Sequence, residues 1–157
     1  IFEAGMGGKV DGAVNFWHFV AKMEAGGMRP LITVVDAGKA LGLDANTPLL
    51  GYVVTGKLAK EKPALVNGLV KASRAAKDIL AKGDTAWEAI RPLMNAKTDK
   101  QFDALKAGFR AGIPNDGPVD LASAQKMLEI MVSLGGKELM GKAATLPEGV
   151  FYAPATN

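Results

Sequence analysis

The hydrophobic pattern of this chain changes its period near Lys57, and this change constrains the fold more than any other feature. Before that point, β-branched and other apolar residues form short runs, "LITVV" within Pro30–Gly38 and "LLGYVV" within Pro48–Gly56. Runs of this kind predict buried strands, and "KVDGAVNF" predicts a further short strand at about Asp11–Val14. After it, apolar residues recur every three or four positions, as on one face of a helix. We therefore expect an α/β fold that is helix-dominated after residue 57.

Several local signals predict where the helices begin and end. Pro63 suits a first helical turn and Gly83 suits the end of the same helix. The segments "TAWE" from Thr85 and "TDKQ" from Thr98 both match the capping box, so a helix is expected to start at each. Asp120 is expected to cap a last helix that ends at Gly135 and Gly136, and Gly112 to close the one before it. The expected buried residues of the two capping-box helices are Trp87, Ile90, Phe102, Leu105 and Phe109.

The long helix predicted after Pro63 has two distinct faces. Its apolar residues form one stripe at helical spacing, consisting of Leu65, Leu69, Ala72, Ala76 and Ile79. Its basic residues, Lys71, Arg74, Lys77 and Lys82, have no aromatic residues between them. We interpret this basic content as a solvated face and not as a phosphate-binding patch.

Composition narrows the class of protein. Of 157 residues, 48% are hydrophobic and 22% are charged, the balance of a globular chain that can bury a core. A net charge of +3 is mild and does not call for nucleic acid as a partner. The absence of cysteine excludes disulfides, thiolate nucleophiles and sulfur-ligated zinc, and a single histidine argues against a transition-metal site. Apolar runs are far shorter than the roughly 18 residues of a membrane span.

The start of the chain carries no pattern of an export signal. It opens on "IFEAGMGGKVDG", which is typical of the interior of a longer sequence. We therefore expect the chain to be a fragment of a longer protein.

The segment "VNFWHF", Val14–Phe19, gathers three aromatic rings and the single histidine of the chain. If a strand ends at Val14 and a helix begins near Trp17, these side chains lie at the carboxyl end of a strand, where α/β proteins bind ligands. Asn15 and His18 offer hydrogen bonds and the rings offer stacking surface. The candidate ligand-binding residues are Asn15, Phe16, Trp17 and His18. Three of them also have a structural explanation: Asn15 as a helix cap, Phe16 as core, and His18 as a hydrogen-bonded scaffold residue.

The order of the segments "GKVDGAVNFWHFVAKMEAGGMRPLITV", "GYVVTGKLAKEKPALVNGLVKASRAAKDIL" and "FRAGIP" resembles the C-terminal half of a periplasmic substrate-binding protein of an ABC transporter. The subfamily is the one for nitrate, sulfonate, taurine and thiamine-pyrimidine precursors, and the resemblance runs from about Gly8 to Phe151. It implies a type II periplasmic binding protein-like bilobal fold. Residues 1–36 would then be the end of the second lobe with a crossing strand, and residues 37–157 the return to the first lobe. The N-terminal half of the family fold would be absent.

The resemblance also implies a function. The chain would be the solute-binding component of an ABC-type importer in the periplasm, clamping a small organic or anionic ligand between two lobes without catalysis. Asn15, Trp17 and His18 would face the cleft, and Tyr52 would lie near the ligand. The partners would be a membrane permease and either the missing N-terminal half or a second copy, with no nucleic acid, metal or cofactor.

Two other readings stay open. An interaction protein on the same scaffold would dock a partner protein instead of a ligand. A pyrimidine-synthase-like enzyme is disfavoured, because relatives with that activity carry a cysteine-rich segment and histidines for their chemistry.

Overall fold

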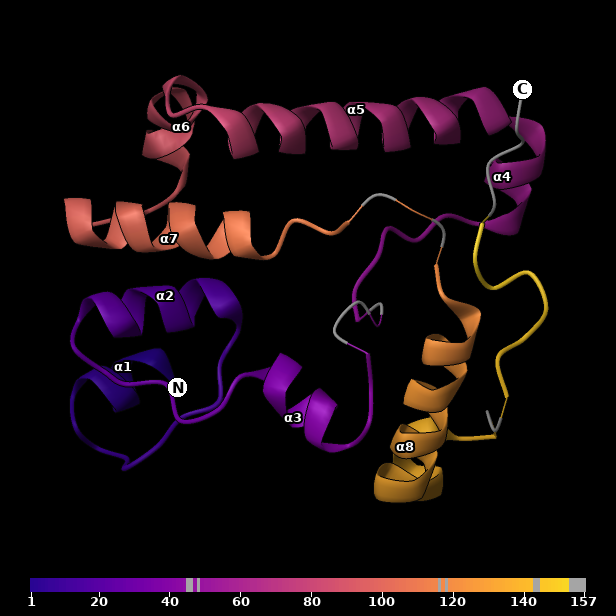
Figure 1. Ribbon diagram of the computed structural model, residues 1–157, viewed down its shortest axis with the longest axis horizontal. Coiled ribbons are helices and arrows are strands. Elements are labelled where there is room, and N and C mark those ends of the chain that lie inside the picture. Colours follow the sequence, from indigo (N-terminus) through magenta and orange to yellow (C-terminus); the bar gives the residue numbers. More distant parts are fainter. Residues whose placement is uncertain (45–46, 48, 116, 118, 143–144, 153–157) are drawn as a thin grey trace. The chain divides into compact units, whose positions relative to one another are not determined.

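The computed structural model describes residues 1–44, 47, 49–115, 117, 119–142 and 145–152, and all regular structure in these ranges is helical (Figure 1). The helices are α1 (Phe2–Met6), α2 (Trp17–Ala25), α3 (Val34–Ala40), α4 (Gly56–Glu61), α5 (Pro63–Lys82), α6 (Thr85–Ile90), the 3₁₀ helix η1 (Arg91–Leu93), α7 (Asp99–Ala111) and α8 (Leu121–Met140). The described ranges contain no strand. The expected α/β bilobal fold is therefore wrong.

The β-branched run at residues 30–38 shows why strands were wrongly expected. The side-chain oxygen of Thr33 accepts a hydrogen bond from the backbone N–H of Asp36 at 3.0 Å, and helix α3 begins at the next residue, Val34. The Thr33 side chain provides a hydrogen-bond partner for a backbone N–H group within the same segment, so no neighbouring strand is needed. β-branched residues favour a strand only where such a neighbouring strand is present.

The other two expected strands are also absent. Residues 11–14 have no regular structure, and neither do residues 49–54; Pro48 lies outside the described residues. The second run leads into α4, whose cap is Thr55, with its side-chain oxygen 3.1 Å from the backbone nitrogen of Leu58.

The helix signals after residue 57 are largely confirmed. Helix α5 runs from Pro63 to Lys82, α7 ends before Gly112, and Thr98 caps α7 by accepting from the backbone N–H of Gln101 at 3.2 Å. Asp120 accepts from the backbone N–H of Ala122 at 3.0 Å at the start of α8. Hydrogen bonds to the free backbone groups at the helix ends thus set these boundaries, as the sequence indicates.

One expected helix detail is wrong. Helix α6 does begin at Thr85, but its cap residue is Asp84, which makes no side-chain capping bond. The expected end of the last helix at Gly135 and Gly136 is confirmed, because the backbone of Gly136 is not helical, with φ of 58° and ψ of −161°, and a further helical stretch of α8 follows this kink and runs to Met140.

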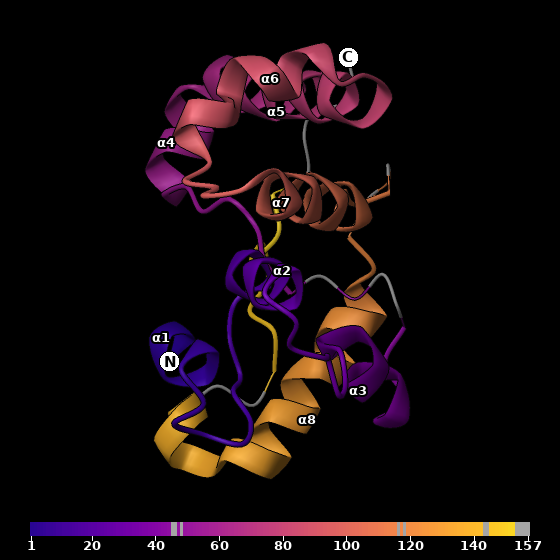
Figure 2. The ribbon, with the colours of Figure 1, turned by 90° about the vertical axis from the view of Figure 1, so that its left-hand side faces the viewer.

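The chain forms two compact units, each made of two separate segments. Unit 1 comprises Ile1–Leu31 and Lys71–Ile113. Helices α2 and α7 pack side by side in it (Figures 1 and 2). Its buried apolar residues are Ala21, Met23, Trp87, Phe102 and Leu105. Trp87, Phe102 and Leu105 confirm the expected core, whereas Ile90 and Phe109 are only half-buried.

Arg110 of α7 ties the end of α5 to the start of α6 within unit 1. Its Nε donates to the carbonyl oxygen of Leu80 at 3.0 Å, and its Nη2 donates to the carbonyl oxygen of Gly83 at 2.9 Å and to a carboxylate oxygen of Asp84 at 2.7 Å. The Arg110 guanidinium, followed by the Lys106 ammonium, lowers the pKa of the Asp84 carboxyl. The side chain of Asp84 therefore pairs with α7, although the residue stands at the cap position of α6.

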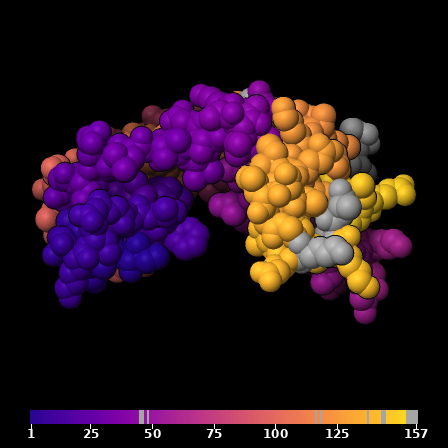
Figure 3. All heavy atoms as spheres, turned by 90° about the horizontal axis from the view of Figure 1, so that it is seen from below, coloured from indigo at the N-terminus to yellow at the C-terminus, as the bar shows by residue number. Residues whose placement is uncertain are grey.

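Unit 2 comprises Ile32–Val70 and Pro114–Asn157. Its buried residues include Leu43, Val66, Ala124 and Leu128, and α8 presents its outer surface in orange to yellow in Figure 3. The side-chain oxygen of Gln125 accepts from the backbone N–H of Leu146 at 3.1 Å, which attaches the C-terminal segment to α8.

The apolar stripe of α5 is exposed. Leu65, Leu69 and Ile79 are 59%, 46% and 60% exposed, although a stripe of this kind ordinarily faces a core. The residue of α5 that is buried is Val66, on a neighbouring face. In the described part of the chain, no helix combines the length and apolar character needed to cross a bilayer.

Candidate functional site

The aromatic segment predicted as a ligand site lies at the start of α2 in unit 1. Helix α2 begins at Trp17, as expected, but the residue at the cap position is Phe16 and not Asn15. Asn15 stands one residue earlier, where its side-chain oxygen accepts from the backbone N–H of Phe16 at 3.0 Å. Its amide nitrogen donates to the sulfur of Met23 at 3.9 Å.

His18 is the centre of the aromatic cluster. Its ring is parallel to that of Phe16, with centroids 6.1 Å apart, and meets the edge of Trp17 at 5.7 Å and the ring of Phe19 at 4.4 Å. The structure thus brings Asn15, Phe16, Trp17 and His18 together on one short segment.

Trp17 remains open to solvent. It is 48% exposed, while one side of its ring lies against Gly108, where an added Cβ would come within 3.2 Å of the indole. Tyr52, the fifth predicted ligand contact, belongs to unit 2 and is 67% exposed on a segment without regular structure. The segment at α2 therefore offers an aromatic surface for stacking, and the role of all five residues in ligand binding stays a prediction.

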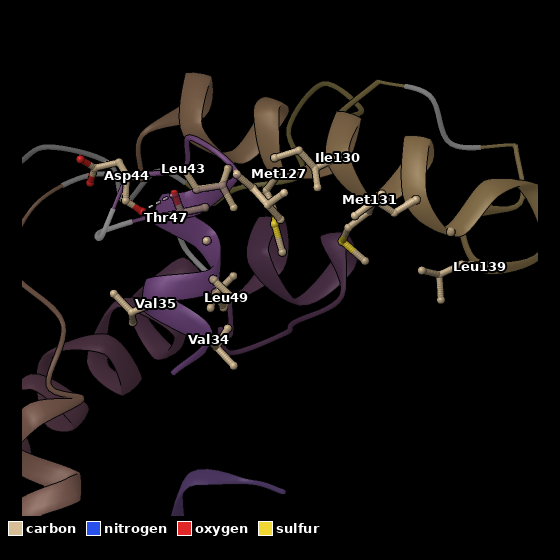
Figure 4. Close-up of a pocket in the computed structure, with 15 residues that line it drawn as sticks. Val34, Val35, Leu43, Asp44, Thr47, Leu49, Met127, Ile130, Met131 and Leu139 are labelled. Atoms are coloured by element: carbon tan, nitrogen blue, oxygen red, sulfur yellow. Dashed lines mark hydrogen bonds between the residues drawn. The ribbon is translucent and has the colours of Figure 1, made fainter. Parts of the chain in front are cut away.

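A cavity of about 440 Å³ lies within unit 2, between α3, the segment that follows it and α8 (Figure 4). The residues that line it are Val34, Val35, Ala37, Gly38, Leu41, Leu43, Asp44, Thr47, Leu49, Met127, Ile130, Met131, Leu134, Gly135 and Leu139. We call this cavity the α3–α8 pocket.

Two helical faces build the α3–α8 pocket. Val34 and Gly38 of α3 and Leu41 directly after it recur at intervals of four and three, and residues 127, 130, 131 and 134 do so on α8, so each helix directs one apolar face to the pocket. Gly38 leaves room on the α3 side: a Cβ built there would make ordinary contact, at 3.6 Å, with the side chain of the buried Leu43.

One end of the pocket is polar. The hydroxyl of Thr47 donates to the carbonyl oxygen of Asp44 at 2.7 Å, and the backbone N–H of Thr47 donates to the same oxygen at 3.1 Å. Figure 4 shows Asp44 and Thr47 at this end of the row of lining residues and Leu139 at the other.

The opposite end is formed by the kink in α8. A Cβ on Gly135 would come within 2.4 Å of a methyl carbon of Leu139, so Leu139 occupies the space beside Gly135 that a side chain would need. The positive φ of 58° at the next residue, Gly136, permits this change of direction. The glycine pair that was expected to stop the helix thus shapes the end of the pocket.

The sequence reasoning missed this pocket, since none of the five predicted site residues lines it. The reason is the assignment of residues 30–38 to a strand, which placed Val34 and Val35 in a sheet. The signal that could have found it is Thr33 followed three residues later by Asp36, a helix start immediately before an apolar run.

In the part of the chain that the structure describes, no three histidine, aspartate or glutamate side chains lie close enough to hold a metal ion. In comparisons with known proteins, no family model and no curated sequence matches this chain.

Proposed function

We propose that this chain is a binding protein that holds a small, largely apolar organic molecule without transforming it. The observation that carries the proposal is the α3–α8 pocket. Its volume of about 440 Å³ falls in the range of roughly 300–1,000 Å³ that small-molecule sites occupy. Ligand sites are also typically apolar with a few polar groups, as this one is.

The side chains that line the pocket support the binding of ligands of different shapes. Met127 and Met131 supply flexible, polarisable thioether side chains, which adjust to ligands of different shape and favour contact with aromatic rings. The polar side chains among the described lining residues are those of Asp44 and Thr47, and the Thr47 proton is already used in a hydrogen bond.

The resemblance described above adds a cellular role to the proposal. We propose that the chain serves as the solute-binding component of an ABC-type importer and delivers its ligand to a membrane permease from the periplasm. What supports this part is the order of segments in the sequence, on which the predicted contacts Asn15, Phe16, Trp17, His18 and Tyr52 also depend.

The test is a pair of substitutions at Gly38 with the uncharged dye N-phenylnaphthylamine as the probe. Gly38→Leu places a branched side chain in the pocket, and we expect it to weaken dye binding about tenfold, a loss of about 1.4 kcal/mol. Gly38→Ala adds only one carbon, at ordinary contact distance from Leu43, and is expected to bind as the wild type does.

The location of the dye is read from the methyl NMR signals of the seven methionines. Met127 and Met131 should shift on titration, whereas Met23 and Met28 of unit 1 should not. Equal dye affinity in wild type and Gly38→Leu, or shifts confined to unit 1, would contradict the proposal.

A second function is favoured by a separate observation. The exposed apolar stripe on α5 is what a protein that docks a partner protein would present, as in the interaction-protein reading. Sedimentation of the chain alone and with candidate partners distinguishes this function, because no residue of the stripe lines the α3–α8 pocket.

A further inference from the structure

We infer that the ligand of the α3–α8 pocket is an extended hydrocarbon chain of about nine carbon atoms that lies along α8. This inference rests on the proposed binding function and narrows it to one class of ligand. It follows from the side chains on the α8 side of the pocket, from the straight length of that side and from the place where it ends.

The α8 side of the pocket is suited to a chain of carbon atoms. Its lining residues, from Met127 to Leu139, are aliphatic, methionine or glycine. A thioether sulfur is only a weak hydrogen-bond acceptor, so a polar group on the body of a ligand would lose its hydration here without a replacement. The part of the ligand that lies along α8 is therefore a hydrocarbon.

Four of these residues form a straight row. Met127, Ile130, Met131 and Leu134 recur every three or four positions and so lie along one face of the helix, and we call them the α8 row. Figure 4 shows Met127, Ile130 and Met131 following one another along α8. From residue 127 to residue 134 the helix advances by about 10 Å. An extended alkyl chain advances by about 1.3 Å per bond, so about nine carbon atoms match the row.

The shape of the α8 row favours an extended chain over a compact molecule. A compact body contacts one turn of the row at a time, whereas a chain laid along the helix contacts every turn. Because the free energy of apolar binding grows with the contact area, the chain gains more from the same number of carbon atoms.

The α8 row ends where the helix changes direction. The backbone of Gly136 is not helical, with φ of 58° and ψ of −161°. Leu139, after this kink, lies against Gly135, where an added Cβ would come within 2.4 Å of one of its methyl carbons. A chain longer than the α8 row therefore does not continue along a straight apolar face, and its additional carbon atoms gain little contact.

Each carbon atom along the α8 row contributes modestly, because the row is partly open to solvent. Leu134, at its end, is 74% exposed. Complete burial of a methylene group would tighten binding about fourfold, and half of that free energy corresponds to about twofold.

The test uses the 1-alkanols from 1-butanol to 1-dodecanol, titrated into the full chain and followed by the methyl NMR signals of Met127 and Met131. We expect the affinity to rise about twofold per methylene up to about nine carbon atoms and then to level off. An affinity that rises without a break to 1-dodecanol, or one that does not depend on chain length, would overturn the inference.

A variant at the end of the α8 row tests its length directly. Leu134→Gln makes the last position polar, and the fold should tolerate this change because the residue is exposed. The affinity should then level off at about six carbon atoms, the length from residue 127 to residue 131, with 1-pentanol binding unchanged. The control is Leu121→Gln, at a leucine of α8 that is 60% exposed and does not line the pocket, and it should bind the whole series as the wild type does.

Two results with Leu134→Gln would overturn the inference: the same break point as in the wild type, or equal weakening of all the alkanols. The outcomes also separate this inference from the proposed function. If the naphthylamine dye moves the signals of Met127 and Met131 and no alkanol does, the inference fails and the proposed function stands. If neither the dye nor any alkanol moves them, the proposed function fails and this inference fails with it.

Discussion

At the scale of single residues, Asp84 shows how an exposed carboxylate can join three helices. It follows α5, precedes α6 and accepts from Arg110 and Lys106 of α7, at 2.7 Å and 3.3 Å. These two cations lower the pKa of its carboxyl below the ordinary value of 3.8, the Arg110 hydrogen bond being the larger cause. A carboxyl whose pKa is lower in the folded chain than in the unfolded chain stabilises the fold in its ionised form.

We therefore predict that Asp84 stabilises the protein in a pH-dependent way. The contribution should be fully present above the unfolded-state pKa of Asp84 and should be lost as the pH falls through its lower folded-state pKa. Wild type should unfold at a higher temperature than Asp84→Asn at neutral pH, and the two curves should converge in acid. Thermal unfolding over a pH series measures this, with Asp11→Asn as the control. A constant difference between wild type and Asp84→Asn at all pH values would show that geometry and not charge is responsible.

At the scale of helices and strands, the sequence predicts helix ends well and strands badly. Pro63, Thr98, Gly112 and Asp120 mark helix boundaries because each satisfies or terminates backbone groups within a few residues. Such signals depend on neighbours in the sequence alone. Helix ends can therefore be predicted without knowledge of the fold.

The prediction of strands from the β-branched runs was wrong because strands depend on residues that are distant in the sequence. Whether Val34 and Val35 lie in a strand depends on a partner strand far away in the sequence, whereas Thr33 offers a cap at once. The predicted site shared this weakness. The segment around Trp17 was recognised as an aromatic cluster, but its expected position at the end of a strand depended on a sheet.

The α5 helix shows a further limit. Its amphipathic pattern predicts an apolar stripe but does not determine which helix face packs against the rest of the chain. In the structure the buried residue is Val66 and not Leu65 or Leu69. Which helix face is covered is decided by the rest of the chain.

The kink of α8 yields a prediction at this scale. At Gly136, φ of 58° and ψ of −161° lie in a region that is nearly restricted to glycine. Gly136→Ala should cost about 1–3 kcal/mol in the free energy of unfolding, or straighten the helix and displace Leu139 from the pocket. Gly38→Ala, inside α3, should instead be neutral or stabilise by up to about 1 kcal/mol, since alanine is the better helix former.

Urea unfolding of both variants measures these changes. The kink would have no structural role if the two alanine substitutions had the same effect on stability and on dye binding.

At the scale of the whole molecule, the exposed stripe on α5 predicts which substitutions the fold tolerates. Leu69→Gln and Ile79→Gln should change the free energy of unfolding by no more than about 0.5 kcal/mol, as at other exposed positions. Val66→Ala should cost about 2 kcal/mol, because it removes buried carbon atoms and leaves a cavity.

Chemical unfolding and sedimentation of the three variants check this prediction together. If Leu69→Gln is as costly as Val66→Ala, then the stripe is covered in solution, and a change in sedimentation would identify a second copy as the cover.

The chain crosses between unit 1 and unit 2 three times, since each unit is assembled from two segments that are separated by about forty residues. During synthesis from the N-terminus, the ribosome therefore releases one half of each unit before the other half of either exists. The last helix to emerge, α8, supplies one wall of the pocket. A ligand of the α3–α8 pocket can therefore stabilise the complete protein but cannot bind the nascent chain before α8 is made. A nascent chain that stalls before residue 121 must remain soluble without a bound ligand.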